Sequence, residues 1–440
     1  MEKTFLSKGG ASLDLSGAEA DSLFSETLSA VRPALGKTGS ALLIPPDVTR
    51  FHSRAGFFTD IACRELSAAG IRVTVLPALG THMALTGAEL ARMFPNTPPS
   101  LFRVHDWRND VVELGRIEKE WIEKVTEGAV SYDWPVQVNK LLRDGGFDLI
   151  VSLGQVVPHE VIGMANHAKN IFVGTGGKEA IDKSHFAGAA FGMERMMGRA
   201  ETPVRAMFDE GLRRYGDRLP PILYVLTVLS ARSGAETSAG GPRGGLALRG
   251  LYAGFGRECF EQAAALARQV NVDLLDEPVK KAVVYLEPEE FRTTWLGNKA
   301  IYRTRMAMAD GGELLIIAPG LERFGEDKGI DVLIRKYGYR PARVIREKAQ
   351  ARPELADSLS AAAHLIHGSS EGRFTVRYCP GPGLSREEIE SVGYEWGGIN
   401  EAMNRYDINK LKTGWNAGDD GRFFFVPNPA LGLWALKDSF

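Results

Sequence analysis

Cysteine is scarce in this sequence. Its 440 residues include three cysteines, Cys63, Cys259 and Cys379, which lie far apart in the chain. Neither a disulfide framework nor a Cys-x-x-Cys metal site can be built from such a set. Because disulfides form mainly in oxidising compartments, this composition is typical of a cytoplasmic protein, and we expect that location.

Long apolar runs and an excess of charge of one sign are also missing. The longest apolar stretch, 222–229, is far shorter than the roughly 20 residues that cross a bilayer. The N-terminal stretch carries Glu2 and Asp14 instead of the apolar core of a signal peptide. The formal net charge is −2, whereas nucleic acids and anionic membranes usually require a basic surface. We therefore expect neither of these as a partner.

A third absence is the dinucleotide-binding fingerprint. No G-x-G-x-x-G follows the first predicted strand, which disfavours a nicotinamide-dependent dehydrogenase. The stretch 174–178, Gly-Thr-Gly-Gly-Lys, also departs from a nucleotide-binding phosphate loop, because its spacing is short and Glu179 replaces Ser or Thr. It still allows the backbone to approach a ligand and leaves the amine of Lys178 as a nucleophile or covalent anchor.

Short apolar runs alternate with helical patterns along the whole chain. We predict strands at 41–44, 72–77, 148–153, 171–173, 282–286, 313–318 and 374–378. We predict helices at 57–68, 86–93, 136–142, 158–165, 260–270, 299–309, 331–337 and 385–392, and an exposed loop at 233–250. Such alternation indicates βαβ units. The chain is long enough for two α/β domains with largely parallel sheets: a cofactor-binding catalytic domain at 1–275, a domain closing over the substrate at 276–440, and the active-site cleft between them.

Four polar clusters, 47–50, 80–82, 154–159 and 174–178, each follow a predicted strand. Because ligands gather at the carboxyl ends of parallel strands, these clusters should meet at one edge of a sheet. Each of these residues also has an ordinary structural interpretation. Asp47 and Arg50 would then form a turn and cap a helix, and His82 and His159 would be loop or helix-end residues without a catalytic role. In a functional interpretation, the guanidinium of Arg50 binds a carboxylate of the ligand through two N–H groups, and the histidines give and take protons near neutral pH.

Taken in order, Asp47-Val48-Thr49-Arg50, Gly80-Thr81-His82, Pro158-His159-Glu160 and Gly176-Gly177-Lys178 resemble the nickel-dependent lactate racemase family over most of the chain. The resemblance implies an isomerase that inverts the C2 carbinol of a 2-hydroxy acid by hydride transfer to a nickel-pincer nucleotide. It also assigns roles to residues. His82 and His159 would be the acid/base pair, and Asp47 and Arg50 the substrate-binding groups. Thr49, Gly176 and Gly177 would contact the cofactor, and Lys178 would be its covalent anchor. The chemistry is consistent with these residues, because a carbinol C–H is too weakly acidic for a histidine to deprotonate, so the cofactor supplies the difficult step.

The sequence departs from the family pattern at three places. Glu194 lies near the register of the nickel-binding histidine, and the nearby His185 is our preferred ligand because imidazole suits nickel better than a carboxylate does. The spacing from His159 to Lys178 is stretched, which leaves His167 as an alternative second acid/base. The substrate-binding lysine of the second domain has no plain match, so that role is assigned to Lys299, Arg303 or Arg305.

The additional polar residues Lys183, Ser184 and His185 favour a sugar acid epimerised at C2 over lactate as the substrate. Besides this small 2-hydroxy acid, the expected partners are the enzymes that assemble the cofactor, so protein made in a foreign host is expected to lack it. The sequence leaves open whether the chain forms a homo-oligomer. Two other functions remain open: a nicotinamide-dependent sugar-acid oxidoreductase, and a metal-free, non-enzymatic binding homologue, which Glu194 favours.

Overall fold

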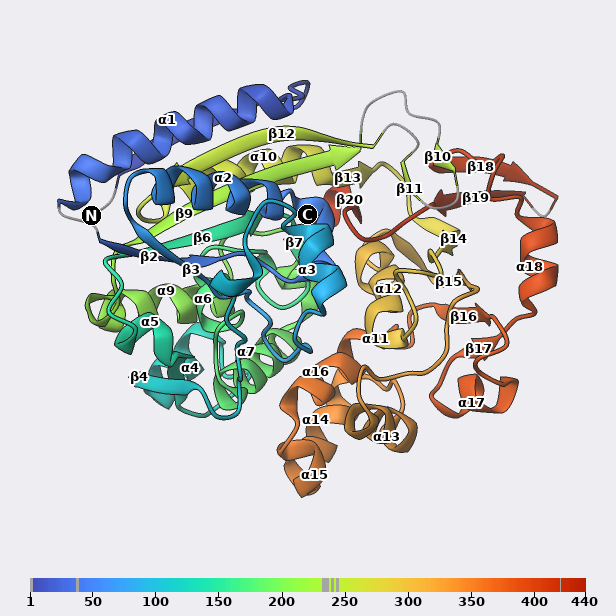
Figure 1. Ribbon diagram of the computed structural model, residues 1–440. Coiled ribbons are helices and arrows are strands. Elements are labelled where there is room, and N and C mark those ends of the chain that lie inside the picture. The colour runs from blue at the N-terminus through green and yellow to red at the C-terminus, as the bar shows by residue number, and fades with distance from the viewer. Residues whose placement is uncertain (1–2, 37–38, 232–236, 239–240, 243–244, 420) are drawn as a thin grey trace. The chain divides into compact units, whose positions relative to one another are not determined.

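The computed structural model describes residues 3–36, 39–231, 237–238, 241–242, 245–419 and 421–440. They form two compact units, each built around its own sheet (Figure 1). Unit 1 comprises 1–187, 196–230 and 247–270, and unit 2 comprises 188–195, 231–246 and 271–440. The predicted fold class, two α/β domains with largely parallel sheets, is confirmed. The main division follows Val270, close to the predicted boundary at 275, but two short segments from within the first 275 residues also group with unit 2.

The sheet of unit 1 has six strands in the order β1-β12-β9-β6-β2-β3. Their bounds are β1 Thr4–Gly9, β2 Ser40–Ile44, β3 Arg72–Val75, β6 Leu149–Gln155, β9 Ile222–Ala231 and β12 Leu246–Gly254. The strands β3, β2, β6 and β9 run parallel, and β1 pairs antiparallel with β12. Every residue of β2 and β6 is buried, as expected for central strands that are covered on both faces.

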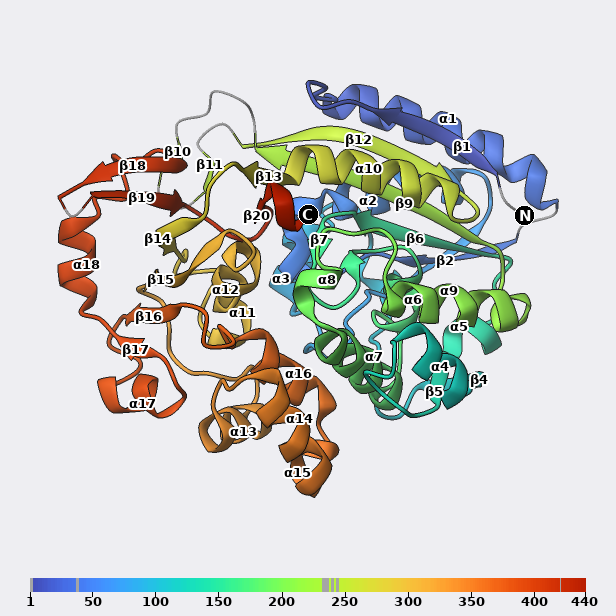
Figure 2. The ribbon, with the colours of Figure 1, turned by 180° about the vertical axis from the view of Figure 1, so that it is seen from behind.

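Helices cover both faces of this sheet (Figures 1 and 2). Those of unit 1 are α1 Gly17–Leu35, α2 Ala55–Ala68, α3 Gly87–Met93, α4 Lys119–Val125, α5 Lys140–Asp144, α6 Ala168–Phe172, α9 Pro203–Tyr215 and α10 Glu258–Asn271, while α7 Lys178–Phe191 and α8 Met193–Met196 extend across the division. On one face, Thr227 of β9 donates to the carbonyl of Ser53, just before α2. On the other face, Ser152 of β6 accepts from Asn170 of α6 at 2.9 Å. The carboxyl ends of the parallel strands therefore lie between two helical layers.

The structure corrects several local predictions. Residues 136–142 are not a helix: β5 Trp134–Asn139 pairs with β4 Val111–Ile117, and α5 follows. Residues 158–165 form the hairpin β7 Pro158–His159 and β8 Gly163–Met164. Residues 171–173, predicted as a strand, end helix α6, so the cluster at 174–178 follows a helix. Periodicity cannot distinguish strand from helix in apolar runs this short, and Asn170 decides the last case by bonding to β2 and β6.

Two further predictions are wrong in part. The helix predicted at 299–309 ends at Thr304, where α12 Lys299–Thr304 stops before β15. In the predicted loop 233–250, residues 246–250 belong to the buried strand β12, and several of the remaining residues lie outside the described part of the chain. Helix α3 begins with a capping box: Thr86 accepts from the backbone N–H of Glu89, whose carboxylate accepts from that of Thr86.

Unit 2 contains a second six-stranded sheet, in the order β17-β16-β15-β14-β19-β18. Its strands are β14 Val279–Tyr285, β15 Met308–Ala318, β16 Thr375–Pro380, β17 Glu395–Trp396, β18 Gly414–Gly418 and β19 Gly421–Val426, while β13 Val272–Leu275 pairs with β20 Leu433–Leu436. All neighbours in the six-stranded sheet are parallel except β18 and β19. The helices of this unit are α11 Thr294–Gly297, α12, α13 Lys328–Tyr337, α14 Ala342–Ala351, α15 Pro353–Ala356, α16 Leu359–His367, α17 Arg386–Ser391 and α18 Ile399–Arg405.

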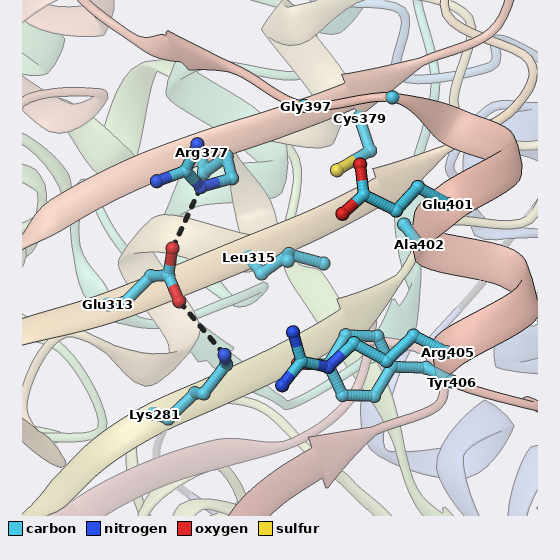
Figure 3. A pocket seen from close by; sticks show the side chains of 11 residues that line it. Lys281, Glu313, Leu315, Arg377, Cys379, Gly397, Glu401, Ala402, Arg405 and Tyr406 are labelled. Carbon is cyan, nitrogen blue, oxygen red and sulfur yellow. Dashed lines mark hydrogen bonds and ion pairs between the residues drawn. The ribbon is translucent and has the colours of Figure 1, made fainter. Parts of the chain in front are cut away.

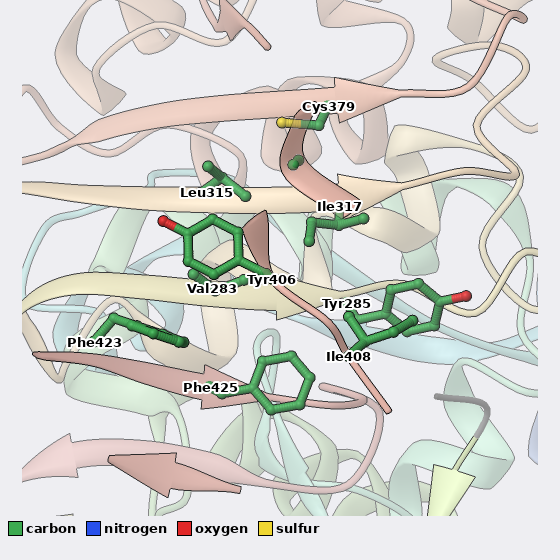
Figure 4. Close-up of a cluster of buried hydrophobic side chains, with 10 residues drawn as sticks. Val283, Tyr285, Leu315, Ile317, Cys379, Tyr406, Ile408, Phe423 and Phe425 are labelled. Carbon is green, nitrogen blue, oxygen red and sulfur yellow. The ribbon is translucent and has the colours of Figure 1, made fainter. Parts of the chain in front are cut away.

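An apolar cluster joins one face of this second sheet to α18 and the segment that follows it (Figure 4). Its members come from four strands and from residues 402–408, and include Val283, Leu315, Cys379, Phe425 and Tyr406. The cluster anchors α18, which has only seven residues and is too short to be stable by itself. Among the described residues, no helix has the length and apolar character needed to cross a membrane.

Candidate active site

The first part of the candidate site is a carboxylate–imidazole pair at the carboxyl ends of β2 and β3. The loops after these strands are held together where Ala78 donates its N–H to the carbonyl of Pro45 at 2.7 Å. Oδ2 of the buried Asp47 lies 2.5 Å from Nδ1 of His82. Because an ionised carboxylate only accepts hydrogen bonds, Nδ1 carries the proton and Nε2 is left as the basic nitrogen. The predicted cap is also present, since Asp47 Oδ1 accepts from the backbone N–H of Thr49 at 3.2 Å and from its hydroxyl at 2.5 Å.

The surroundings of Asp47 stabilise its ionised form. Burial raises the pKa of this carboxyl, but His82, Thr49 and Arg50 together lower it below its ordinary value. The His82 side chain is 42% exposed, so its ring is accessible to a ligand while the carboxylate behind it is not. The pair therefore has the geometry of a general base with an orienting carboxylate.

His159 lies in the β7–β8 hairpin, which follows the carboxyl end of β6. Its ring is buried, and Nδ1 accepts the backbone N–H of Val161 at 3.1 Å, which places the proton of the neutral ring on Nε2. Burial, together with the positive charges of Lys169 and Arg50, lowers the pKa of His159 well below its ordinary value, although Glu160 opposes this. His159 is therefore neutral at pH 7, with an N–H available as a donor.

Lys169 belongs to the same group of side chains, although sequence reasoning gave it no role. It is half-buried in α6, and its pKa is lowered to about 8 by burial first and then by Arg50, while Glu160 and Asp47 oppose the shift. A substantial fraction of its amine is therefore neutral near pH 8 and able to act as a nucleophile. The sequence held a signal for it, since Lys169 lies between Asn166 and Asn170 in a short polar stretch, within the spacing from His159 to Lys178 that we describe as stretched.

His185 lies on α7 and presents one ring nitrogen as a candidate ligand. Its Nδ1 lies 2.7 Å from the carbonyl of Ile181, a bond in which Nδ1 must donate, so Nε2 keeps its lone pair. Burial, followed by the charge of Lys169, lowers the pKa of His185 to about 4. The ring is thus neutral at physiological pH, the state that binds a metal.

These side chains form one electrostatic group at the predicted edge of the sheet in unit 1. Arg50, Lys169, Glu160 and His185 all influence the pKa of His159, and Asp47 influences that of Lys169. The structure therefore brings together the predicted residues Asp47, Arg50, His82, His159 and His185, and adds Lys169 and Glu160. No three His, Cys, Asp or Glu side chains in the described ranges are arranged to hold a metal ion by themselves.

Lys178 begins α7, two turns before His185. Its Nζ pairs with Asp182 Oδ2 at 2.5 Å, and its side chain is 50% exposed. Asp182 contributes to the pKa of His185, so the two lie near one another. The preceding Gly176 packs against protein, because a Cβ there would lie 1.9 Å from the carbonyl oxygen of Phe172. The predictions of Lys178 as covalent anchor and of Gly176 and Gly177 as cofactor contacts are not tested by this geometry.

His167, the alternative acid/base, has different surroundings. Its ring packs against that of Tyr224, tilted by 32°, with a centroid distance of 3.9 Å, and its Nε2 lies 3.2 Å from the carbonyl of Gly256. Burial, followed by the charges of Arg205 and Arg257, lowers its pKa well below the ordinary value. His159 is thus the histidine that shares the electrostatic group of Arg50 and Lys169.

The predicted substrate residues of the second domain lie in or beside α12 in unit 2. Arg303 is buried and donates to the carbonyls of Ala430 and Gly432. Arg305 forms an ion pair with Glu194 at 2.7 Å, and Lys299 lies over the ring of Phe291 at 5.4 Å. The carboxylate of Glu194, the alternative nickel ligand, is therefore paired with a guanidinium.

Unit 2 also contains a cavity between its sheet and α18, and this cavity holds none of the predicted site residues (Figure 3). Three of its charged groups pair with one another: Glu313 binds both Arg377 and Lys281 at 2.8 and 3.2 Å. A second carboxylate, Glu395, lies 2.6 Å from the same guanidinium. The guanidinium of Arg377 and the amine of Lys281 are thus each paired with a carboxylate within unit 2.

Comparisons with known proteins bear on the family and the fold of this chain. Residues 29–196 match the family model described as the lactate racemase N-terminal domain. A crystal structure of a protein from Thermotoga maritima is similar to this chain with a TM-score of 0.80 and 22% identity, covering 98% of this chain and 100% of that one. The lactate racemase apoprotein from Thermoanaerobacterium thermosaccharolyticum gives 0.70 and 14%, covering 98% and 94%. At such identities, the structural likeness shows the fold alone. A search of curated proteins finds no match.

Proposed function

We propose that this chain, which belongs to the lactate racemase family through its N-terminal domain at 29–196, is an isomerase that inverts the C2 carbinol of a 2-hydroxy acid. The observation that carries the proposal is the Asp47–His82 pair together with a second, buried histidine, His159, in one electrostatic group with Arg50. Inversion requires a base for the hydroxyl proton, a donor that returns one, and a cation for the carboxylate. This group supplies all three.

The nickel-pincer nucleotide known for this family fits the donor set of the site. A cofactor that brings carbon and sulfur ligands of its own requires one imidazole from the protein, and we assign this role to Nε2 of His185. Two lysines are candidates for the covalent anchor: Lys178, from the sequence resemblance, and Lys169, which the structure favours because of its lowered pKa and its place beside His159. When bound, the cofactor supplies a hydride acceptor for the carbinol carbon.

The side chains of the protein bind the substrate carboxylate and transfer the hydroxyl protons. Arg50 binds the substrate carboxylate through its fork of N–H groups. Nε2 of His82 takes the hydroxyl proton, and Asp47 stabilises the resulting imidazolium, as its lowered pKa favours. His159 presents its Nε2–H, so it donates a proton when the hydroxyl is re-formed on the other face. In the reverse direction the two histidines exchange roles.

We propose a sugar acid as the substrate, although the support differs from that given by the sequence. Lys183 pairs with Glu179, and Ser184 donates to the carbonyl of Ile181, so both side chains are engaged within the protein. The support comes instead from Glu160, whose Oε2 lies 3.7 Å from Nδ1 of His159, because a carboxylate close to the acid/base group can accept several hydrogen bonds at once. A substrate with several hydroxyls can donate a hydrogen bond to such an acceptor, whereas lactate has no hydroxyl beyond the one at C2.

The test follows the C2 hydrogen in protein made together with the cofactor-assembly enzymes. A sugar acid deuterated at C2 is incubated in ordinary water without added nicotinamide, and the C2 epimer is analysed by NMR and mass spectrometry. We expect epimerisation with retention of deuterium, since a hydrogen passed through a histidine would exchange with water. Complete washout of deuterium would overturn the hydride mechanism, and no epimerisation of any 2-hydroxy acid would overturn the proposed function.

Two variants test the acid/base pair in the same assay. His82→Gln and His159→Gln should each lower the rate by about 10²-fold or more, as expected for loss of a general acid or base. His167→Phe is the matched control, because it keeps an aromatic ring against Tyr224. Near-normal activity of His159→Gln together with an inactive His167→Phe would transfer the second role to His167.

A further inference from the structure

Arg205 of α9 is a completely buried cation that bonds to one short stretch of backbone. It is 0% exposed. Its Nη2 donates to the carbonyl of Met164 at 2.6 Å and its Nη1 to the carbonyl of Asn166 at 3.2 Å. The guanidinium lies 4.1 Å from the ring centroid of Phe260. Burying a charge is costly, so a guanidinium that holds two carbonyls of one turn calls for an explanation.

The held stretch joins two members of the candidate active site. His159 pairs with Gly163 across the β7–β8 hairpin, and Met164 ends that hairpin. Helix α6 begins at Ala168, and Lys169 is its second residue. Residues 164–167, which we call the connecting turn, are therefore the link between His159 and the α6 lysine.

The backbone of the connecting turn adopts a conformation that it would not favour alone. Asn166 and His167 have φ values of 69° and 58°, in the left-handed region that non-glycine residues seldom occupy. Two consecutive residues of this kind cost free energy that the surrounding structure must offset. The fork of Arg205 suits this task, because its N–H groups meet the carbonyl of Met164, just before the strained pair, and that of Asn166, between its two residues.

We propose that Arg205 is a positioning residue that holds the connecting turn and thereby sets the placement of His159 relative to Lys169. The roles of these two side chains rest on the proposed function, whereas the contacts of Arg205 do not. The positive charge of Arg205 also contributes to the lowered pKa of Lys169. Arg205 thus acts on the site through the backbone and through its charge.

The test compares Arg205→Met with Arg249→Met. Methionine keeps packing against Phe260 but removes both donors. Arg249 is a matched control, since it is also buried in unit 1 and donates to the carbonyl of Leu13 and the hydroxyl of Ser230, which are not part of the connecting turn. Arg205→Lys is a third variant, which keeps the charge and can donate to one carbonyl or the other. If Arg205→Met fails to fold, Arg205→Lys is compared with Arg249→Met in its place.

The first measurement is amide hydrogen exchange on protein without cofactor, which needs no activity. Ala165 donates its N–H to Val157, and Asn170 donates to His167, so both amides report on the connecting turn. In Arg205→Met we expect exchange in 158–173 to rise about 10-fold or more, with a smaller rise in Arg205→Lys. In Arg249→Met the rise should occur near Leu13 and β12 instead. Unchanged exchange at 158–173 in Arg205→Met would overturn the proposal.

The second measurement separates kcat from KM in cofactor-loaded protein. Misplaced catalytic groups should lower kcat by about 10- to 100-fold in Arg205→Met and leave KM within about twofold, with partial recovery in Arg205→Lys. Arg249→Met should keep kcat near wild type. A normal kcat despite faster exchange would make Arg205 merely structural. If the wild-type protein shows no isomerase activity, the proposed function fails while the exchange measurement still decides whether Arg205 holds the turn.

Discussion

Within the site, the two histidines of the proposed acid/base pair are prepared in different ways. His82 is partly exposed and is bonded through Nδ1 to a buried carboxylate, so its Nε2 is basic. His159 is buried, accepts a backbone N–H at Nδ1, and carries its proton on Nε2. One ring therefore begins as an acceptor and the other as a donor, which suits a reaction that removes a hydroxyl proton and returns one.

The two candidate lysines give the sharpest prediction at this scale. We expect Lys169→Met to lose the covalent adduct, because the amine of Lys169 has a pKa of about 8 and lies in the electrostatic group of His159 and His185. Lys178→Met should keep the adduct, since Lys178 is half exposed and paired with Asp182. Intact mass and peptide mapping of cofactor-loaded protein measure both. An adduct mapped to Lys178 would return the role to the residue that the sequence resemblance indicates.

Three buried histidines should make the fold sensitive to acid. Burial lowers the pKa of His159, His167 and His185 below the ordinary value near 6.5. As the pH falls below 6.5, the unfolded chain takes up protons that the folded chain does not, so stability decreases. Each such histidine contributes about 1.4 kcal/mol per pH unit until its folded-state pKa is reached.

His167→Phe tests this pH dependence, because the phenyl ring can keep its contact with Tyr224. Urea unfolding between pH 5 and 7 should show a shallower loss of stability in the variant, by about 1.4 kcal/mol per pH unit. An unchanged slope would mean that His167 is protonated in the folded protein.

At the scale of elements, the short helix α6 gives the site its arrangement. Asn170 donates to the carbonyl of Ile44 and to the hydroxyl of Ser152, which ties α6 to the carboxyl end of β2 and to the middle of β6. Lys169, one residue earlier, is thereby held at the same edge. After α6, Gly176 packs against the backbone of Phe172, and its carbonyl lies 3.0 Å from Nε2 of the buried His105. The connection to α7 is therefore fixed from two sides.

A substitution at Gly176 tests this close packing. Gly176→Ala should destabilise the protein by about 2 kcal/mol or more, because its Cβ would lie 1.9 Å from a backbone oxygen that cannot easily move. Gly216→Ala is the control: it has a helical backbone and open space around the new methyl group, and should change stability by less than about 0.5 kcal/mol. Thermal and urea unfolding measure both. A stable Gly176→Ala protein would show that the connection before α7 can shift.

At the scale of the whole molecule, the protein is expected to require other proteins to complete its site. The described residues contain no ready-made cluster of three metal-binding side chains, so nickel alone should not be retained. We expect chain made with the cofactor-assembly enzymes to carry about one nickel per chain and the chain made without them to carry almost none. Metal analysis after desalting measures this.

The same assay tests the ligand that we assign. His185→Ala should fold but lose nickel, because Nε2 of His185 is the assigned ligand. Glu194→Gln should retain nickel, since Glu194 pairs with Arg305. The opposite result would exchange the two roles.

The sequence by itself determined the α/β class and three strands of each six-stranded sheet, β2, β3 and β6 in unit 1 and β14, β15 and β16 in unit 2, because buried parallel strands are apolar runs that need no distant partner to be recognised. It also located Asp47, Arg50, His82 and His159, since the first three follow strands and His159 lies in the hairpin that follows another. Tertiary structure decided the rest of the site. Whether 171–173 is strand or helix depended on the bonds of Asn170 to β2 and β6, and that choice placed Lys169 beside His159. Contacts between segments far apart in the chain fix such positions, and no local pattern records them.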